Sequence, residues 1–252
     1  MKNIKGIDII TAEEKSEGSG ARVLRPFPGS QLDHVDPFVL MDEFFVNSEA
    51  GFPEHPHRGF EAVTYMLKGG FVHEDSGGNE ATVREGGLQR ITMGKGIRHS
   101  EAPASDGMNH GIQLWINLPK RLKGMKPGYE VIPEKKLETS TENGVTEKIL
   151  IGKNSGPEVQ TQVRYSDIKL EDSDFIWKIE AGYAGFVYVL RGNGLIKTGQ
   201  SEFDIGAGQA AVTKRTPGES EYRIETEAGM RFVSALGTPH EEEVNMHGPY
   251  VD

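Results

Sequence analysis

Short runs of β-branched and aromatic residues, separated by glycines, recur along most of the chain. Glycine supplies 32 of the 252 residues, nearly twice the average share of about 7%. Because glycines mark turns and each run is only four to eight residues long, the pattern predicts short strands packed as a β-sandwich or barrel. The runs expected to form strands are residues 61–67, 80–83, 88–92, 111–118, 148–151, 175–179, 185–190, 209–213 and 230–236.

Helical patterns are scarce. Thr11, followed three residues later by Glu14, has the spacing of a helix start. Gly18 and Gly20 follow almost at once, so any helix should be short.

The composition excludes several classes of protein. Hydrophobic residues make up 36% of the chain, enough for one large or two small folded domains. The formal net charge of −10 disfavours direct binding to nucleic acid. The N-terminus lacks the apolar segment of a signal peptide, and no stretch is long and apolar enough for a membrane span. We therefore expect a soluble, cytoplasmic protein without a direct nucleic-acid or membrane partner.

The chain contains a weak internal repeat. Residues 65–69 align with residues 188–192 at an offset of 123, and residues 87–92 align with residues 208–213 at an offset of 121. Between the two copies, residues 119–148 are mostly polar and are interpreted as a connection. The repeat predicts two copies of one β-unit.

Two spaced pairs of side chains indicate a metal site. In an extended segment, residues two apart project from the same face, so His55 and His57 can bind one ion together. The glycines at positions 94 and 96 allow a turn that brings His99 and Glu101, again two apart, towards the first pair. Cysteine is absent, so any metal must be held by histidine and carboxylate. Another acid, Glu61, follows His57 by four residues.

The other histidines have plainer interpretations. His73 lies in a segment that resembles a hairpin loop, where a solvent-facing or loop-bracing role is favoured over metal binding. The remaining four lack a spaced partner and are taken as structural: His34, His110, His240 and His247. Among the aromatic residues near the metal motifs, Phe44, Phe52 and Trp115 are expected to pack in the core, with lining of an apolar pocket as the alternative.

These motifs resemble those of a known family. His55, His57 and Glu61, with a later glycine turn and His99, are similar to the two motifs of the cupins. The closer resemblance is to the pirins, which are two-cupin proteins. It is carried in order by residues 36–44, 55–61, 64–65, 73–76, 94–101 and 113–119, and by a tail motif at 247–251.

The resemblance implies an all-β bicupin of two tandem jelly-roll barrels. We expect an N-terminal metal-binding cupin domain in residues 1–132 and a C-terminal degenerate cupin domain without metal in residues 133–252. The general cupin pattern implies that Glu61 is the carboxylate ligand. The pirin resemblance instead assigns the metal to His55, His57, His99 and Glu101, and leaves Glu61 as a nearby acid that orients an imidazole N–H. The repeat offsets place Lys178, Glu180, Ala184, Ser220 and Tyr222 at the corresponding positions of the second copy.

The metal and the reaction follow from the same resemblance. Three imidazoles and a carboxylate suit Fe(II), Mn, Ni, Cu or Zn, and the pirin resemblance favours Fe(II). It implies a quercetin 2,3-dioxygenase-like enzyme that opens flavonol-type aromatic substrates with O2, in which Glu101 accepts the enol proton. The alternative is an iron-binding regulatory protein that contacts a transcription factor or a metabolic enzyme.

Overall fold

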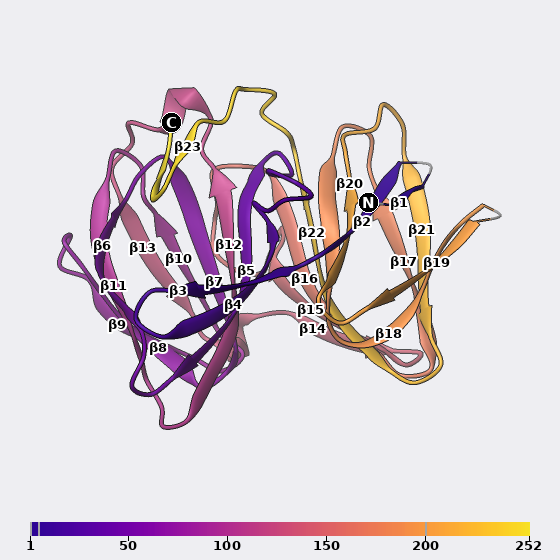
Figure 1. The fold of residues 1–252 in the computed structure, drawn as a ribbon, viewed down its shortest axis with the longest axis horizontal. Coiled ribbons are helices and arrows are strands. Elements are labelled where there is room, and N and C mark those ends of the chain that lie inside the picture. Colours follow the sequence, from indigo (N-terminus) through magenta and orange to yellow (C-terminus); the bar gives the residue numbers. More distant parts are fainter. Residues whose placement is uncertain (1, 5, 200) are drawn as a thin grey trace.

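In a computed structural model, which describes residues 2–4, 6–199 and 201–252, the chain forms two β-barrels side by side (Figure 1). The prediction of an all-β protein with two copies of one unit is therefore confirmed. The strands of the first barrel are β3 (Glu13–Glu17), β4 (Ala21–Phe27), β5 (Phe38–Asn47), β6 (Phe52–His57), β7 (Phe60–Lys68), β8 (Gly70–Asp75), β9 (Glu80–Arg84), β10 (Leu88–Thr92), β11 (Ile97–Pro103), β12 (Met108–Asn117) and β13 (Gly128–Ile132). They form a seven-stranded sheet in the order β13-β10-β7-β12-β5-β4-β3 and a four-stranded sheet in the order β6-β11-β8-β9.

The second barrel repeats this order. Its strands are β1 (Lys2–Ile4), β2 (Ile7–Thr11), β14 (Thr139–Glu142), β15 (Val145–Ile151), β16 (Val163–Leu170), β17 (Ser173–Ile179), β18 (Ala184–Thr198), β19 (Ser201–Gly206), β20 (Gln209–Thr213), β21 (Ser220–Thr226) and β22 (Met230–Gly237). The path β20-β18-β22-β16-β15 corresponds to β10-β7-β12-β5-β4, and the path β17-β21-β18-β19 corresponds to β6-β11-β8-β9.

Both ends of the chain cross between the barrels. The N-terminal strand β2 pairs with β20 and so extends the large sheet of the second barrel. After β22 the chain returns to the first barrel, where β23 (Met246–His247) and β24 (Tyr250–Val251) form a small hairpin (Figure 1). The division into domains at residues 132 and 133 stays a prediction, but strand pairing places residues 7–11 in the sheet of the second barrel.

The large sheets of the two barrels pack against each other. One apolar cluster joins side chains of the first barrel, such as Tyr65 and Leu114, to side chains of the second, such as Phe186 and Val233. Strands β7 and β18 are therefore buried on both faces over most of residues 61–67 and 185–190, the runs that were expected to form strands. This explains why their sequences are continuous apolar runs and do not alternate.

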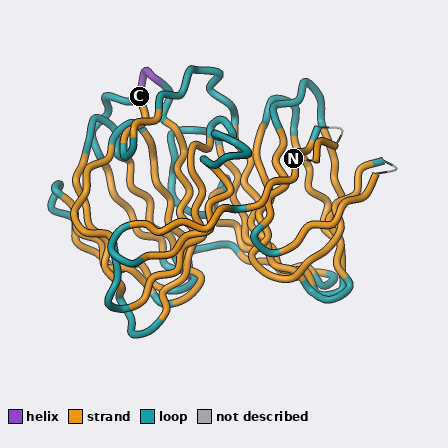
Figure 2. The backbone as a smooth tube through the Cα atoms, in the orientation of Figure 1, coloured by secondary structure: helices purple, strands orange, loops and turns teal. Residues whose placement is uncertain are grey.

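Little of the chain is helical (Figure 2). The described residues contain two short 3-10 helices, η1 (Lys120–Leu122) and η2 (Glu134–Lys136). The helix start suggested at Thr11 was wrong, because Glu13–Glu17 pairs with β4 as strand β3. The polar connection also contains strand β13, which pairs with β10. Neither helix in the described ranges has the length and apolar character that crossing a membrane requires.

Candidate metal centre

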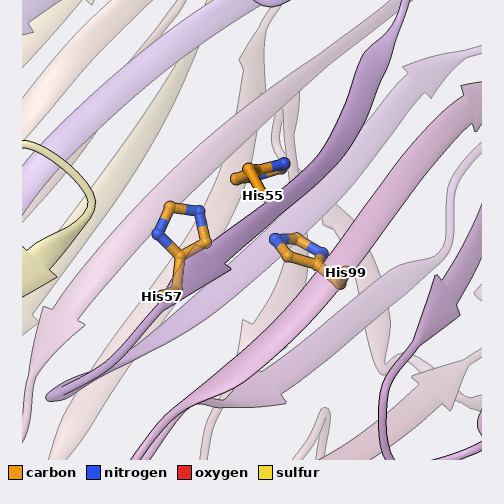
Figure 3. A group of neighbouring side chains, drawn as sticks. All are labelled: His55, His57 and His99. Carbon is orange, nitrogen blue, oxygen red and sulfur yellow. The ribbon is translucent and has the colours of Figure 1, made fainter.

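Three imidazoles converge on the inner face of the small sheet of the first barrel (Figure 3). His55 and His57 lie on β6, and His99 lies directly opposite His55 on the antiparallel neighbour β11. Because side chains on a strand alternate between faces, the two-residue spacing and this register put all three rings on one side. One ring nitrogen from each residue lies within 4.8 Å of the other two.

The hydrogen bonds of two of these histidines leave the same nitrogen free. His55 Nδ1 lies 2.8 Å from the carbonyl oxygen of Pro53, and His57 Nδ1 lies 2.9 Å from that of Pro249. A carbonyl only accepts hydrogen bonds, so in the neutral rings Nδ1 carries the hydrogen and Nε2 keeps its lone pair. Both ring nitrogens of His99 are buried without a hydrogen-bond partner. Buried polar atoms normally have partners, so this donor set fits a metal ion.

Burial keeps two of the rings uncharged. Burial, and to a smaller extent the neighbouring histidines, lower the pKa of His57 to about 4 and that of His99 to about 2. At neutral pH these imidazoles are therefore unprotonated, the form that binds metals.

Glu101 lies behind this group. Its carboxylate falls within 4.8 Å of ligand nitrogens of His99 and His73, and the group of His55, His57 and His99 does not include it. Burial raises the pKa of Glu101 to about 7, against the opposing effect of hydrogen bonds with Gln89 and Gln113. Glu101 is thus a buried carboxyl, next to the histidines, that exchanges a proton near neutral pH.

His73 is a functional candidate that the sequence interpretation missed. It is fully buried on strand β8, directly opposite Glu101 on β11, and its ring stacks on Tyr129 with 4.1 Å between centroids. Its Nε2 pairs with Asp75 at 3.2 Å, and its Nδ1 has no partner. The solvent-facing role expected for His73 was therefore wrong. The loop-bracing role fits its pairing with Asp75, whose carboxylate accepts hydrogen bonds from the backbone amides of Gly77 and Asn79. The sequence did hold a signal for this position, because the two-residue spacing of His73 and Asp75 indicates a strand with both side chains on one face.

Glu61 does not orient an imidazole. The turn at Gly59 carries the chain from β6 onto β7, in the other sheet. There the Glu61 carboxylate accepts hydrogen bonds from the Thr92 hydroxyl and the Gln160 backbone amide, both at 2.7 Å. Residues Val63 and Tyr65 on the same face pack in the cluster between the barrels, so Glu61 points away from the barrel interior.

A cavity of about 510 Å³ opens over His55 and His57. Phe44, Phe52 and Trp115 all line it and also pack in buried apolar clusters, so both roles considered for these aromatic residues are confirmed. Further lining residues are Glu17, Val23, Arg25, Leu40, Asp42, Gln113, Met246, Gly248 and Pro249. The cavity therefore combines an aromatic lining with polar groups beside the histidines.

The second barrel has an apolar interior at the corresponding strands. On the paired strands β17 and β21, the buried apolar positions are Trp177, Ile179, Tyr222 and Ile224, and Thr226 is also buried. The repeat offset made Lys178 the counterpart of His55. Lys178 is exposed, so on β17 the alignment of the two copies is shifted by one residue. Tyr222, which the repeat offset makes the counterpart of Glu101, lies in this core.

The other histidines lie outside both ligand groups. His110 pairs with Glu43 at 2.8 Å and stacks on Phe45. His240 Nε2 lies 3.0 Å from the Thr161 hydroxyl oxygen, and His247 is exposed.

Comparisons with known proteins agree with this geometry. The family model for pirin matches residues 20–116, and the model for the pirin C-terminal cupin domain matches residues 165–252. A pirin-like protein of Solanum lycopersicum is 37% identical over 247 residues, which cover 96% of this chain and 84% of the relative.

Two solved structures share the fold. A quercetin 2,3-dioxygenase from Acinetobacter baumannii superposes with a TM-score of 0.86 at 24% identity, covering 98% of this chain and 91% of that one. The bacterial pirin YhhW from Escherichia coli, in complex with nickel(II), superposes with a TM-score of 0.75 at 20% identity, covering 92% and 99%. With family models over both barrels and relatives of this identity along almost its full length, the chain belongs to the pirin family.

Proposed function

We propose that this pirin is a metal-dependent dioxygenase that opens flavonol-type, quercetin-like substrates with O2. The observation that carries the proposal is the convergence of three imidazole nitrogens, two of which belong to histidines that line an aromatic cavity. The name of the Acinetobacter relative and the nickel(II) complex of the Escherichia coli relative support it.

His55, His57 and His99 would hold the ion, with Glu101 as fourth ligand. Glu101 lies beside His99 but outside the three-histidine group, so its carboxylate has to turn towards the ion. Nitrogen and oxygen ligands suit Fe(II), Mn, Ni, Cu or Zn, and we propose Fe(II). When bound, the ion supplies a Lewis acid with open positions for a chelating substrate.

The protein's own residues provide binding and proton transfer. A cavity of about 510 Å³ lies within the ~300–1,000 Å³ range of small-molecule sites. Phe44, Phe52 and Trp115 offer flat apolar surfaces to an aromatic ring system. The Glu101 carboxylate, buried beside His99, accepts the enol proton of the substrate.

The test begins with metal analysis of the purified chain. Quercetin is then added in air, and its flavonol absorbance band is followed over time. We expect the band to disappear with wild-type protein, and to persist with His57→Ala and with chelator-treated protein. His34→Ala, at a histidine outside both ligand groups, serves as the matched control and should retain activity. An intact band with fully loaded wild-type protein would contradict the enzyme proposal and favour the iron-binding regulator.

A further inference from the structure

The hairpin of residues 245–252 belongs to the second half of the sequence but forms part of the site in the first barrel. Reciprocal backbone hydrogen bonds of 3.1 and 2.9 Å between Asn245 and Asp252 close the hairpin. Met246, Gly248 and Pro249 line the cavity next to His55 and His57. The hairpin is therefore one wall of the candidate active site.

The hairpin also contacts a metal-binding histidine directly. The carbonyl oxygen of Pro249 lies 2.9 Å from His57 Nδ1, although the two residues are 192 positions apart in sequence. His55, by contrast, uses the carbonyl of Pro53 on its own strand. The tautomer and the ring plane of His57 thus depend on a segment from outside the barrel strands.

Arg58, the neighbour of His57, clasps the hairpin in three ways. Its guanidinium pairs with both carboxylate oxygens of Asp252, at 2.9 and 2.7 Å. It also lies over the Tyr250 ring, with 4.2 Å to the centroid. Its carbonyl accepts a hydrogen bond of 3.1 Å from the amide of Val251, and the Val251 side chain is fully buried.

Close backbone packing completes the docking. Lys123 Nζ donates to the carbonyl oxygens of Val251, at 2.8 Å, and Gly59, at 2.9 Å. Gly59 has a φ of +89°, and a Cβ at this position would lie 1.7 Å from the Val251 oxygen. Only glycine lets the hairpin approach this closely.

We propose that hairpin 245–252 is a positioning element of the metal centre. Docking over Gly59 and pairing with Arg58 hold the Pro249 carbonyl against His57 Nδ1, which fixes Nε2 in its metal-binding orientation. Removing partners of this kind typically weakens metal binding about 10–100-fold. The inference rests on the proposed metal centre, so its test measures metal release rather than activity.

The main test compares two glycine variants of the full chain loaded with Co(II). Gly59→Ala forces the hairpin away, because the new Cβ would overlap the Val251 oxygen. Gly107→Ala is the matched control, because its φ of +77° gives similar backbone strain with no atom within 4 Å of the new Cβ. The readouts are the Co(II) absorption spectrum, the rate of Co(II) transfer to a chelator, and hydrogen exchange at the Val251 amide.

A second pair of variants is milder and preserves folding. Asp252→Asn weakens the ion pair between the hairpin and Arg58. Glu54→Gln, the control, weakens the 2.9 Å pair with Arg98, which joins β6 to β11 without touching the hairpin. We expect release to be about 10–100-fold faster in Gly59→Ala and moderately faster in Asp252→Asn. Both controls should stay within about twofold of wild type, since neither changes a partner of the ligands.

The outcomes separate the two proposals. Wild-type protein that takes up no Co(II) would overturn the metal centre and the hairpin proposal together. The hairpin proposal alone would be overturned by a variant that takes up Co(II) normally and keeps the wild-type spectrum and release rate, although its Val251 amide is no longer protected from hydrogen exchange. Equal acceleration in Gly59→Ala and Gly107→Ala would also overturn it, because backbone strain would then be sufficient.

Discussion

The two barrels share a strand order but differ in what fills them. On the small sheet of the first barrel, β6 and β11 direct His55, His57 and His99 inwards. The corresponding strands of the second barrel bury Trp177 and Tyr222. The same scaffold therefore holds either a polar cluster beside a cavity or a packed apolar core. Both barrels bury polar atoms without partners, among them the two ring nitrogens of His99 and Trp177 Nε1. A neutral imidazole has a nitrogen lone pair that can bind a metal ion, whereas an indole N–H only donates hydrogen bonds, so a metal should stabilise the first barrel and not the second.

The largest effect is expected from opening the core of the second barrel. Trp177 is 2% exposed, and truncating such a side chain costs about 3–5 kcal/mol. Trp177→Ala should lower the free energy of unfolding by this amount in urea titrations followed by circular dichroism, while metal content stays unchanged. Ile176→Ala, at a position 40% exposed on the same strand, should stay within about 0.5 kcal/mol of wild type. Loss of metal in Trp177→Ala would show that the barrels are not independent.

The next effect is stabilisation of the first barrel by metal. A ligand that binds only the folded state at 100 times its Kd stabilises by about 2.7 kcal/mol. Titrating metal-free protein with Ni(II) or Fe(II) should raise the unfolding free energy of wild type, and His99→Ala should abolish this gain because a central ligand is lost. Tyr222→Phe, in the second barrel, should keep it. If metal raised the unfolding free energy of His99→Ala as much as that of wild type, the metal would have to bind at another site.

Metal-free protein should also be sensitive to acid. An unfolded histidine titrates near 6.5, whereas burial lowers the pKa of His57 to about 4 and that of His99 to about 2. Below pH 6.5 the unfolded chain binds protons that the folded chain does not, so stability falls as pH decreases. For one such group the loss between pH 6.5 and 5 is on the order of 2 kcal/mol. Urea titrations across this range should give a shallower slope for His57→Phe, and an unchanged slope would contradict the assignment.

Local patterns in the sequence identify most residues of the candidate site, and contacts between distant segments account for those that the patterns missed. The two-residue spacing of His55 and His57 is a property of one strand, and the sequence shows it directly. His73 was misplaced because its position depends on the pairing of β8 with β11. The Pro249 carbonyl could not be predicted, because a backbone group that arrives from 192 residues away leaves no residue pattern.

Glu61 gives the smallest expected effect and the sharpest test within the first barrel. The general cupin pattern made it a rival to Glu101, yet it faces the second barrel and accepts hydrogen bonds from Thr92 and Gln160. Glu61→Gln should therefore change the metal release rate less than twofold, whereas Glu101→Gln should accelerate it at least about tenfold, the lower end for partners of a metal site. Release from Co(II)-loaded protein into a chelator measures both. Because Gln keeps the size and one carbonyl oxygen of Glu, packing is matched. The two variants differ in whether the lost carboxylate lies on β7 of the large sheet or on β11 of the small sheet, beside the histidines. Faster metal release in Glu61→Gln alone would mean that the Glu61 carboxylate binds the metal. The alternation of side chains along β7 would then have led to the wrong ligand.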